Sequence, residues 1–191
     1  MSQQQREVLY DRQPRAFTEG TVENINQQWI FFDSETDEAS SLEEYVHQEV
    51  EVQRGRNWYR GTLEENGVVN LRRETFSLSD GEQIKIRKQM IYSFDSLLEE
   101  LDDDSFFQFV TSLNSLDFSI YDCIYSYNQL SFLRDVHSKS GVNFLIFDNE
   151  SQICAVQHHF FYSEKRHDRF EFTLNTGKRI MIEKLNNPSD S

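Results

Sequence analysis

Three consecutive carboxylates in the stretch "LDDDSFFQF", residues 101–109, resemble a metal or acid–base site more than any other part of the chain. Calcium loops alternate oxygen ligands, include a glycine and end on a distant bidentate glutamate, and no such pattern follows Asp104. A helix that begins near Ser105 has unpaired backbone N–H groups, which a carboxylate at Asp103 or Asp104 would satisfy. We therefore interpret the triplet as a junction between two helices, with a divalent cation site as the alternative.

The histidines and cysteines are the other groups that could bind a metal or take part in catalysis. His158 and His159 are neighbours on an expected strand, so their side chains point to opposite faces and cannot share one ion. A zinc site would have to be assembled from residues far apart in the sequence: His47, His137, His158, His159 and His167. Cys123 and Cys154 lie among apolar residues, where burial raises the pKa of a thiol. We expect no metal, no cofactor and no catalytic residue.

The charge of the chain argues against general binding to nucleic acid or to an anionic membrane. The 191 residues carry a net charge of −14, and residues 93–122 contain eight acidic and no basic side chains. The first residues have no apolar stretch like that of a signal peptide. No window approaches the ~20 apolar residues that span a bilayer. We expect a cytoplasmic protein without a membrane partner, for which nucleic acid is not the favoured ligand.

The amino-terminal half has the periodicity and turns of a small all-β lobe. A hairpin is expected to turn at Asn26–Gln27. Asn66–Gly67 and Asp80–Gly81 have the residue types that tight hairpin turns require. About six short strands result within residues 19–90. Their spacing is typical of a curled sheet or of a small SH3-like or Sm-like barrel.

From Ser93 the pattern changes to that of helices. A first helix buries an apolar stripe at helical spacing, and a second runs from about Ser105 to Leu116. A third, "FSIYDCIYSYNQLSFLR" (residues 118–134), is apolar on most sides, which is typical of a buried helix at the centre of a lobe.

After this predicted central helix the strand period returns. The continuous apolar run "VNFLIFD" predicts a central strand covered on both faces. "SQICAVQHHFFY" is expected to pair with it. "DRFEFTLNTGKRIMIEKL" is the clearest hairpin of the chain, with its turn at Gly177.

Together these patterns predict an α+β protein. Residues 1–18 form a helix and an arm, of which the helix ends before Pro14. Residues 19–92 form the SH3-like or Sm-like β-barrel lobe. Residues 93–186 form a lobe of two or three helices packed on an antiparallel sheet of about four strands, and residues 187–191 are a disordered tail.

Two sets of residues are candidates for binding. In the barrel lobe, aromatic and basic side chains are expected to make a contact patch: Trp58, Tyr59, Arg60, Lys85 and Arg87. In the second lobe, Tyr121, Tyr125 and His158 would line a pocket between the aromatic helix and the carboxyl-terminal sheet.

The leading function is a non-catalytic intracellular binding or adaptor protein that recognises a protein or peptide partner, or a second copy of itself. Its support is the contact patch, because Trp, Tyr and Arg are enriched at interface hot spots. One alternative is an enzyme or small-ligand-binding protein that uses the pocket. Another is nucleic-acid binding through the basic barrel face, where aromatic and basic groups could stack bases and hold phosphates.

Long blocks of the sequence resemble a known family. These blocks are "RKQMIYSFDSLLEEL", "FFQFVTSLNSLDFSIYDCIYSYNQLSFL", "KSGVNFLIFDNE" and "RFEFTLNTGKRI". They are similar to an uncharacterised family of small proteins from Bacillus and related bacteria, classed as a domain of unknown function. The resemblance spans nearly the whole chain and implies a bacterial cytoplasmic setting. It brings no activity, cofactor or functional residue.

Overall fold

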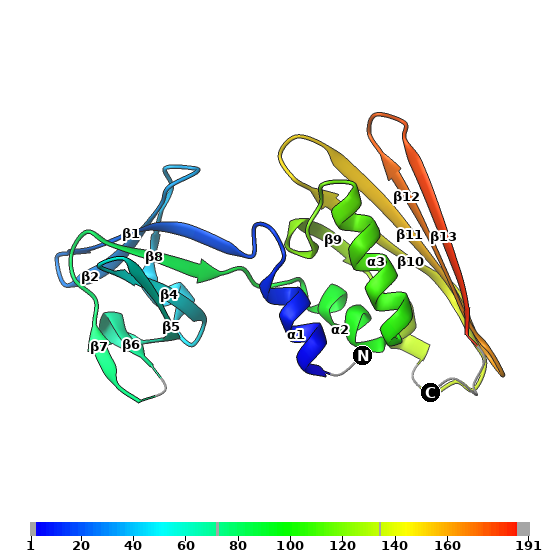
Figure 1. The fold of residues 1–191 in the computed structure, drawn as a ribbon, viewed down its shortest axis with the longest axis horizontal. Helices are drawn as coiled ribbons and strands as arrows, with labels where there is room; N and C mark the ends of the chain where they lie inside the picture. Colours follow the sequence, from blue (N-terminus) through cyan, green and yellow to red (C-terminus); the bar gives the residue numbers. More distant parts are fainter. Residues whose placement is uncertain (1–2, 72, 134, 187–191) are drawn as a thin grey trace. The chain divides into compact units, whose positions relative to one another are not determined.

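A computed structural model describes residues 3–71, 73–133 and 135–186 (Figure 1). The tail predicted for residues 187–191 lies outside this part of the chain. The chain divides into two compact units, and we describe each by itself. Ala16–Lys88 form the all-β unit, whereas the residues up to Arg15 and those from Gln89 onward form the helix–sheet unit. In the described ranges, none of the helices combines the length and the apolar character that crossing a membrane requires.

The all-β unit is one antiparallel sheet of eight strands in the order β3-β2-β1-β8-β4-β5-β6-β7. Its strands are β1 (Phe17–Ile25), β2 (Gln28–Asp33), β3 (Ala39–Ser41), β4 (Glu49–Arg54), β5 (Asn57–Glu64), β6 (Val68–Asn70), β7 (Thr75–Ser77) and β8 (Glu82–Arg87). Two short 3-10 helices, η1 (Leu42–Tyr45) and η2 (Glu65–Gly67), connect strands.

Two of the three predicted hairpin turns of this unit, Asn26–Gln27 and Asn66–Gly67, are confirmed. Asn26 and Gln27 have φ angles of 53° and 68°, and Asn66 has 59°. Gly81 also has a positive φ of 76°, but the hairpin predicted at Asp80–Gly81 is wrong, because β7 pairs with β6 whereas β8 pairs with β1 and β4. Two constraints favour glycine at position 67. Its φ of 68° lies in the left-handed region, and a Cβ atom there would lie 2.4 Å from Trp29 Nε1. A type I′ turn needs positive φ angles, so these dipeptides end the strands where the sequence indicates.

The predicted closed barrel is wrong. The sheet ends at β3 and β7, and within the described residues these two strands do not pair with each other. Both are only three residues long. Short edge strands of this kind limit pairing with any further strand. The turns of the sequence locate strand ends, but closure depends on pairing between distant strands, which turns do not encode.

The helix–sheet unit contains the remaining elements. Its helices are α1 (Gln3–Asp11), α2 (Tyr92–Glu100) and α3 (Asp103–Ser115), with the 3-10 helices η3 (Ile120–Asp122) and η4 (Leu130–Leu133). Its strands are β9 (Cys123–Tyr127), β10 (Lys139–Asp148), β11 (Ile153–Tyr162), β12 (Arg166–Leu174) and β13 (Arg179–Asn186). They form a five-stranded antiparallel sheet in the order β13-β12-β11-β10-β9.

The predicted aromatic helix over residues 118–134 is absent. Strand β9 occupies its centre, between η3 and η4, and lies at the edge of the sheet beside β10. A short apolar run is compatible with a helix or a strand. Its Ile and Tyr side chains favour a strand, and the free edge of β10 supplies the hydrogen bonds. The register shifts between Ile146 and Phe147, so Ile124 is an extra residue on β9, as in a β-bulge.

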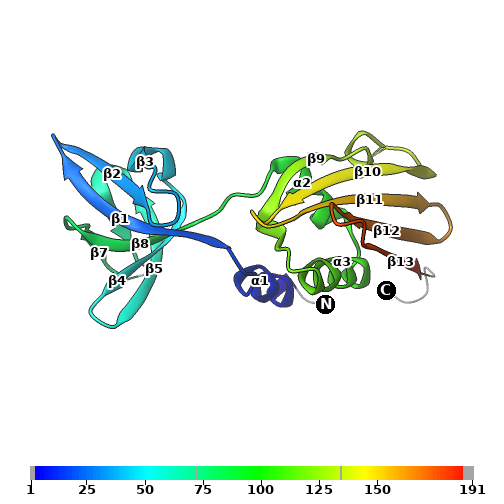
Figure 2. The ribbon, with the colours of Figure 1, turned by 90° about the horizontal axis from the view of Figure 1, so that it is seen from above.

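Helices cover one face of the five-stranded sheet (Figure 2). Phe109 of α3 lies at the centre of the buried core, with its ring centroid 5.2 Å from that of Phe170 and 5.9 Å from that of Phe172. The prediction that "VNFLIFD" is covered on both faces is wrong. Leu145 and Phe147 are buried, but Phe144, on the other face of β10, is 45% exposed.

The fold class therefore differs from the α+β prediction. The protein is mainly β, with an eight-stranded and a five-stranded antiparallel sheet, in place of a barrel and a sheet of about four strands. Three α-helices of nine to thirteen residues accompany the second sheet in the described ranges.

Truncation of Phe109 tests this packing. Phe109→Ala should lower the free energy of unfolding of the helix–sheet unit by about 3–5 kcal/mol, because it removes a buried ring and leaves a cavity. The matched control is Phe107→Ala on the same helix, since Phe107 is 47% exposed and should change stability by no more than ~0.5 kcal/mol. Urea unfolding of the full chain measures both, and equal losses would contradict the core assignment.

Candidate functional site

One face of the all-β unit brings together four of the five residues predicted for its contact patch. Strand register places Lys85 (β8), Glu51 (β4) and Arg60 (β5) in one row across the sheet. Arg87 lies two residues along β8 from Lys85, and Trp58 two residues along β5 from Arg60, so all project on the same side. We call this surface the ladder face and define it as Phe17, Glu19, Glu49, Glu51, Trp58, Arg60, Lys85 and Arg87.

Each cation of the ladder face lies against an aromatic ring. The Lys85 ammonium is 4.2 Å from the Trp58 ring centroid. The guanidinium of Arg87 is 5.3 Å from the ring of Phe17, and that of Arg60 is 5.9 Å from it. These distances fall within the range of cation–π attraction, so the rings hold the charged groups in place on the sheet.

Each cation also pairs with a glutamate. The Arg60–Glu51 distance is 3.0 Å and the Arg87–Glu49 distance is 3.1 Å. Lys85 lies 3.4 Å from Glu19. Three cations therefore alternate with three carboxylates, and the face is charge-balanced rather than basic.

Tyr59, the fifth predicted residue, lies on the other face of β5. It is paired with the buried Val52 of β4 and is 40% exposed. Because neighbours on a strand point to opposite faces, Tyr59 cannot join Trp58 and Arg60 in one contact surface. It serves as a natural control position for that surface.

The three predicted pocket residues do not converge. His158 is fully buried on the helix-covered side of the five-stranded sheet, whereas Tyr125 is 50% exposed and projects from the opposite face at the edge. Tyr121 lies in η3 and packs against the core beneath the helices. The pocket was predicted from a helix that places its tyrosines over the sheet, and β9 takes the place of that helix.

His158 instead belongs to a buried polar cluster that the sequence did not reveal. The carboxylate of Asp168 accepts hydrogen bonds from Ser105 Oγ at 2.8 Å and from Tyr162. It also lies 2.7 Å from His158 Nε2. Asn143 completes the cluster, with its amide nitrogen 3.1 Å from His158 Nδ1. One sequence signal could have revealed this cluster. Asp168 stands at an inward-facing position of β12, and the next inward-facing residues of that strand are Phe170 and Phe172.

The tautomer of His158 follows from the bonds of Asn143. The Oδ1 atom of Asn143 accepts the backbone N–H groups of Gln129 and Leu130 at 2.7 and 3.3 Å. Its NH₂ group must therefore face His158, which makes Nδ1 an acceptor and leaves the proton on Nε2 to donate to Asp168. The orientation of the imidazole is therefore set from both sides.

This cluster contains Ser, His and Asp but not the geometry of nucleophilic catalysis. The Ser105 hydroxyl donates to Asp168 and not to His158, whereas an activated serine needs the base as its own partner. Ser105, His158 and Asp168 are each at most 1% exposed. The cluster ties α3 to β11 and β12, and we assign it a structural role.

Burial and hydrogen bonding act on Asp168 in opposite directions. Burial by itself would raise its pKa, but the hydrogen bonds from His158, Tyr162 and Ser105 outweigh it and hold the pKa below the ordinary value for aspartate. Hydrogen bonds to a carboxylate favour its charged form. Asp168 therefore stabilises the folded protein in its ionised state.

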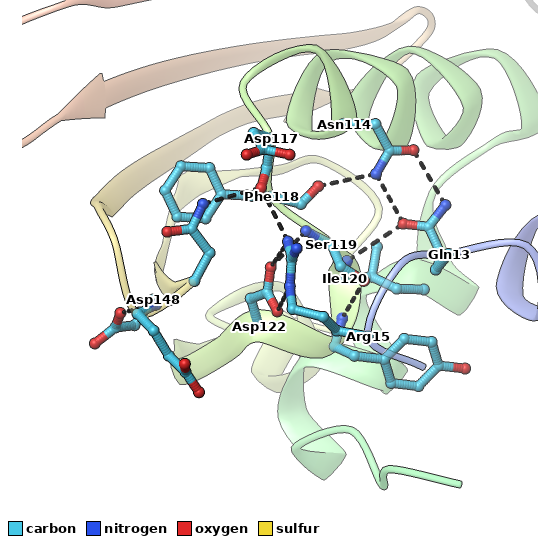
Figure 3. Close-up of polar contacts among 12 residues, drawn as sticks. Gln13, Arg15, Asn114, Asp117, Phe118, Ser119, Ile120, Asp122 and Asp148 are labelled. Atoms are coloured by element: carbon cyan, nitrogen blue, oxygen red, sulfur yellow. Dashed lines mark hydrogen bonds and ion pairs between the residues drawn. The ribbon is translucent and has the colours of Figure 1, made fainter. Parts of the chain in front are cut away.

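A second polar cluster fixes the segment after α1 (Figure 3). Arg15 forms two hydrogen bonds with Asp122, from Nε at 2.8 Å and from Nη2 at 2.6 Å. The hydrogen bond with Asp122 raises the pKa of Arg15 above its ordinary value. Gln13 and Asn114 exchange side-chain hydrogen bonds of 3.1 and 2.9 Å. Because Asp122 is almost fully buried, this pair anchors the chain immediately before β1.

The acidic triplet is a helix junction, as predicted. Asp102 is the N-cap of α3 and accepts the backbone N–H of Ser105 at 2.8 Å, one residue earlier than the predicted caps. Asp103 pairs with Arg6 at 2.8 Å, and Asp104 lies 3.4 Å from Lys184. The three carboxylates thus point to three different partners.

Both thiols behave as the apolar surroundings predict. Burial raises the pKa of Cys123 to about 12 and that of Cys154 to about 11. At neutral pH both are protonated, and a thiol in this state is a poor nucleophile.

Removing the charge of Asp168 should change how stability depends on pH. Because the pKa of Asp168 is lower in the folded than in the unfolded protein, its stabilising effect is fully present at neutral pH. The effect is lost as the pH falls below the unfolded-state pKa of ~3.9 and then through the lower folded-state pKa. Asp168→Asn should lower the free energy of unfolding by about 1–3 kcal/mol at pH 7 and by less in acid. The measurement is urea unfolding at several pH values, with exposed Asp135→Asn as the control. A parallel shift at all pH values would contradict the assignment.

The comparisons place the chain among proteins of unknown function. Residues 4–184 match the model of the family described as "Protein of unknown function (DUF2777)". The chain is 35% identical over 137 residues to the uncharacterized protein YisN of Bacillus subtilis (strain 168), which covers 71% of this chain and 70% of that protein. No solved structure matches the chain. The match over most of the described residues shows that this chain belongs to the DUF2777 family.

Proposed function

We propose that this protein is a non-catalytic binding protein that recognises a protein or peptide partner through the ladder face. The observation that carries the proposal is the convergence of Trp58, Arg60, Lys85 and Arg87 on one side of the all-β sheet. Trp and Arg are the residue types most enriched at interface hot spots.

The ladder face is also held ready for contact. Its residues lie on three paired strands and on the beginning of β1, and their cation–π contacts and ion pairs restrict the long side chains. Side chains that are ordered before binding lose less entropy when a partner arrives. This organisation supports recognition by a surface, without a cavity.

The charge pattern favours a partner of mixed charge over a polyanion. Arg60, Arg87 and Lys85 each have a glutamate within 3.4 Å. A nucleic acid backbone would have to displace these carboxylates and would meet a chain of net charge −14, which weakens phosphate binding. A peptide or protein surface with its own alternating charges can instead pair with both signs.

Substitution of the ladder face tests the proposal. The 191-residue chain is used as bait in an extract of a bacterium that encodes this family, and a captured partner is then purified for titration. Trp58→Ala with Arg60→Ala should weaken binding at least tenfold, or about 1.4 kcal/mol, while circular dichroism stays unchanged. Tyr59→Ala, on the opposite face of the same strand, is the control. If the purified partner binds the double variant as tightly as the unsubstituted protein, the ladder face is not its site.

A further inference from the structure

The five-stranded sheet has a second face that its helices do not cover. The side chains on this face alternate with the buried ones along each strand. Those of Phe144, Phe161 and Met181 are 45%, 49% and 62% exposed, and that of Tyr127 is 44% exposed. We call this surface the open face. Tyr127 and Phe144 are direct neighbours on β9 and β10, and exposed apolar side chains that adjoin in this way are of the kind that marks an interaction site.

Two neighbouring rows run across the open face. In the first, strand register aligns Tyr127, Phe144, Gln157, Glu171 and Met181. In the second, it aligns Val142, His159, Arg169 and Glu183. Apolar side chains lie over β9 and β10, whereas β12 and β13 carry charged side chains of both signs, with the apolar Met181 on the outermost strand, β13.

We propose that the open face binds a second copy of this chain and forms a two-fold symmetric dimer. A two-fold axis that lies between the two rows, perpendicular to the strands, places each row of one copy over the other row of its partner. Phe144 then meets Val142, and Glu171 meets Arg169, at two symmetric places each. A symmetric interface needs one surface that is complementary to itself, and Glu171 in one row with Arg169 in the other provides opposite charges on β12.

The charge of the open face fits this occupant. Arg169 and Glu171 lie 3.0 Å apart within one copy, so two copies bring two such pairs together in an alternating group of four charges. A partner with a single sign of charge would leave one member of each pair opposed by a like charge. The chain as a whole has a net charge of −14, and the balanced open face allows two copies to approach without direct repulsion at the interface.

The size of the open face suits a stable dimer. Strands lie about 4.8 Å apart and rise about 3.4 Å per residue, so five strands with about eight residues each cover roughly 600 Å². With side-chain relief, the accessible area buried is on the order of 800 Å² per partner, which is the size of a standard specific interface. Two sheets that pack face to face keep their strands nearly aligned, at about 30°.

At the β9 edge of the sheet, contacts with α2 disfavour the other common mode, in which strands pair edge to edge. The hydroxyl of Ser93 donates to the carbonyl oxygen of Ser126 on β9 at 3.1 Å. The side chain of Asn128 in turn donates to the carbonyl oxygen of Ser93 at 3.3 Å. These contacts place the beginning of α2 at the outer edge of β9, where an added strand would have to pair.

Mass measurement in solution tests the dimer. Sedimentation equilibrium of the full chain in ~0.15 M salt, where screening reduces repulsion beyond ~8 Å, should give twice the monomer mass of 22.8 kDa at micromolar concentration. Phe144→Asp should give the monomer mass, because it places a charge in the apolar half of the interface. Phe107→Asp on α3, which is similarly exposed, is the control and should remain dimeric.

Charge reversal gives an independent test of the geometry. Arg169→Glu and Glu171→Arg should each weaken the dimer at least tenfold, because each places like charges opposite one another. The double variant should restore it, since both members of every pair are exchanged. A monomeric protein at all concentrations, which would mean that a different molecule or nothing covers the open face, would overturn the proposal. A dimer that persists in Phe144→Asp would overturn it as well.

Discussion

The one-sided burial of the five-stranded sheet is the constraint on which the helix–sheet unit depends. Successive side chains of a strand point to opposite faces, so the choice of a covered face assigns every residue of β9 to β13 to the core or to the surface. Phe109, Phe170 and Phe172 meet on the covered side. The same alternation leaves Phe144 and Met181 on the open side.

Burial also explains the state of the ionisable groups. A buried charge is costly unless it is paired and hydrogen-bonded, and the buried carboxylates described here are fully engaged. Asp168 has three side-chain hydrogen-bonding partners, and Asp122 is held by Arg15 and by the backbone N–H of Ser119. The residue types that suggest chemistry in the sequence thus join helices, strands and the amino-terminal segment to one another.

The two sheets present different kinds of exposed face. The ladder face of the all-β unit alternates charges and supports them with aromatic rings. The open face of the helix–sheet unit carries apolar side chains over β9 and β10, and over β12 and β13 it carries charged side chains together with Met181. A surface of the first kind suits a partner of mixed charge, whereas a surface of the second kind is complementary to its own copy. One chain can therefore offer two binding surfaces with separate roles.

Local patterns in the sequence predicted local features well. The turn residues Asn26–Gln27 and Gly67 adopt the positive φ angles that they were expected to adopt. The acidic triplet separates α2 from α3. Side-chain alternation correctly placed Trp58 with Arg60 on one face of β5, and Lys85 with Arg87 on one face of β8. In each case the prediction depended only on neighbours along the chain.

The failures arose where a decision depended on distant residues. The aromatic run at residues 118–134 has apolar side chains at both helical and strand spacing, and the unpaired edge of β10 decided for a strand. The meeting of Ser105, His158 and Asp168 likewise depends on how α3 lies across the sheet.

The sequence by itself determined the hairpin turns at Asn26–Gln27 and Asn66–Gly67, which side chains share a strand face, and the apolar surroundings that raise the pKa of both thiols. Those properties follow from backbone geometry and from composition over a few residues. Only the tertiary structure decided the number and order of the strands, the covered face of each sheet and the partners of the buried charges. These depend on hydrogen bonds and packing between segments far apart in the chain, whose pairing energies no local pattern contains.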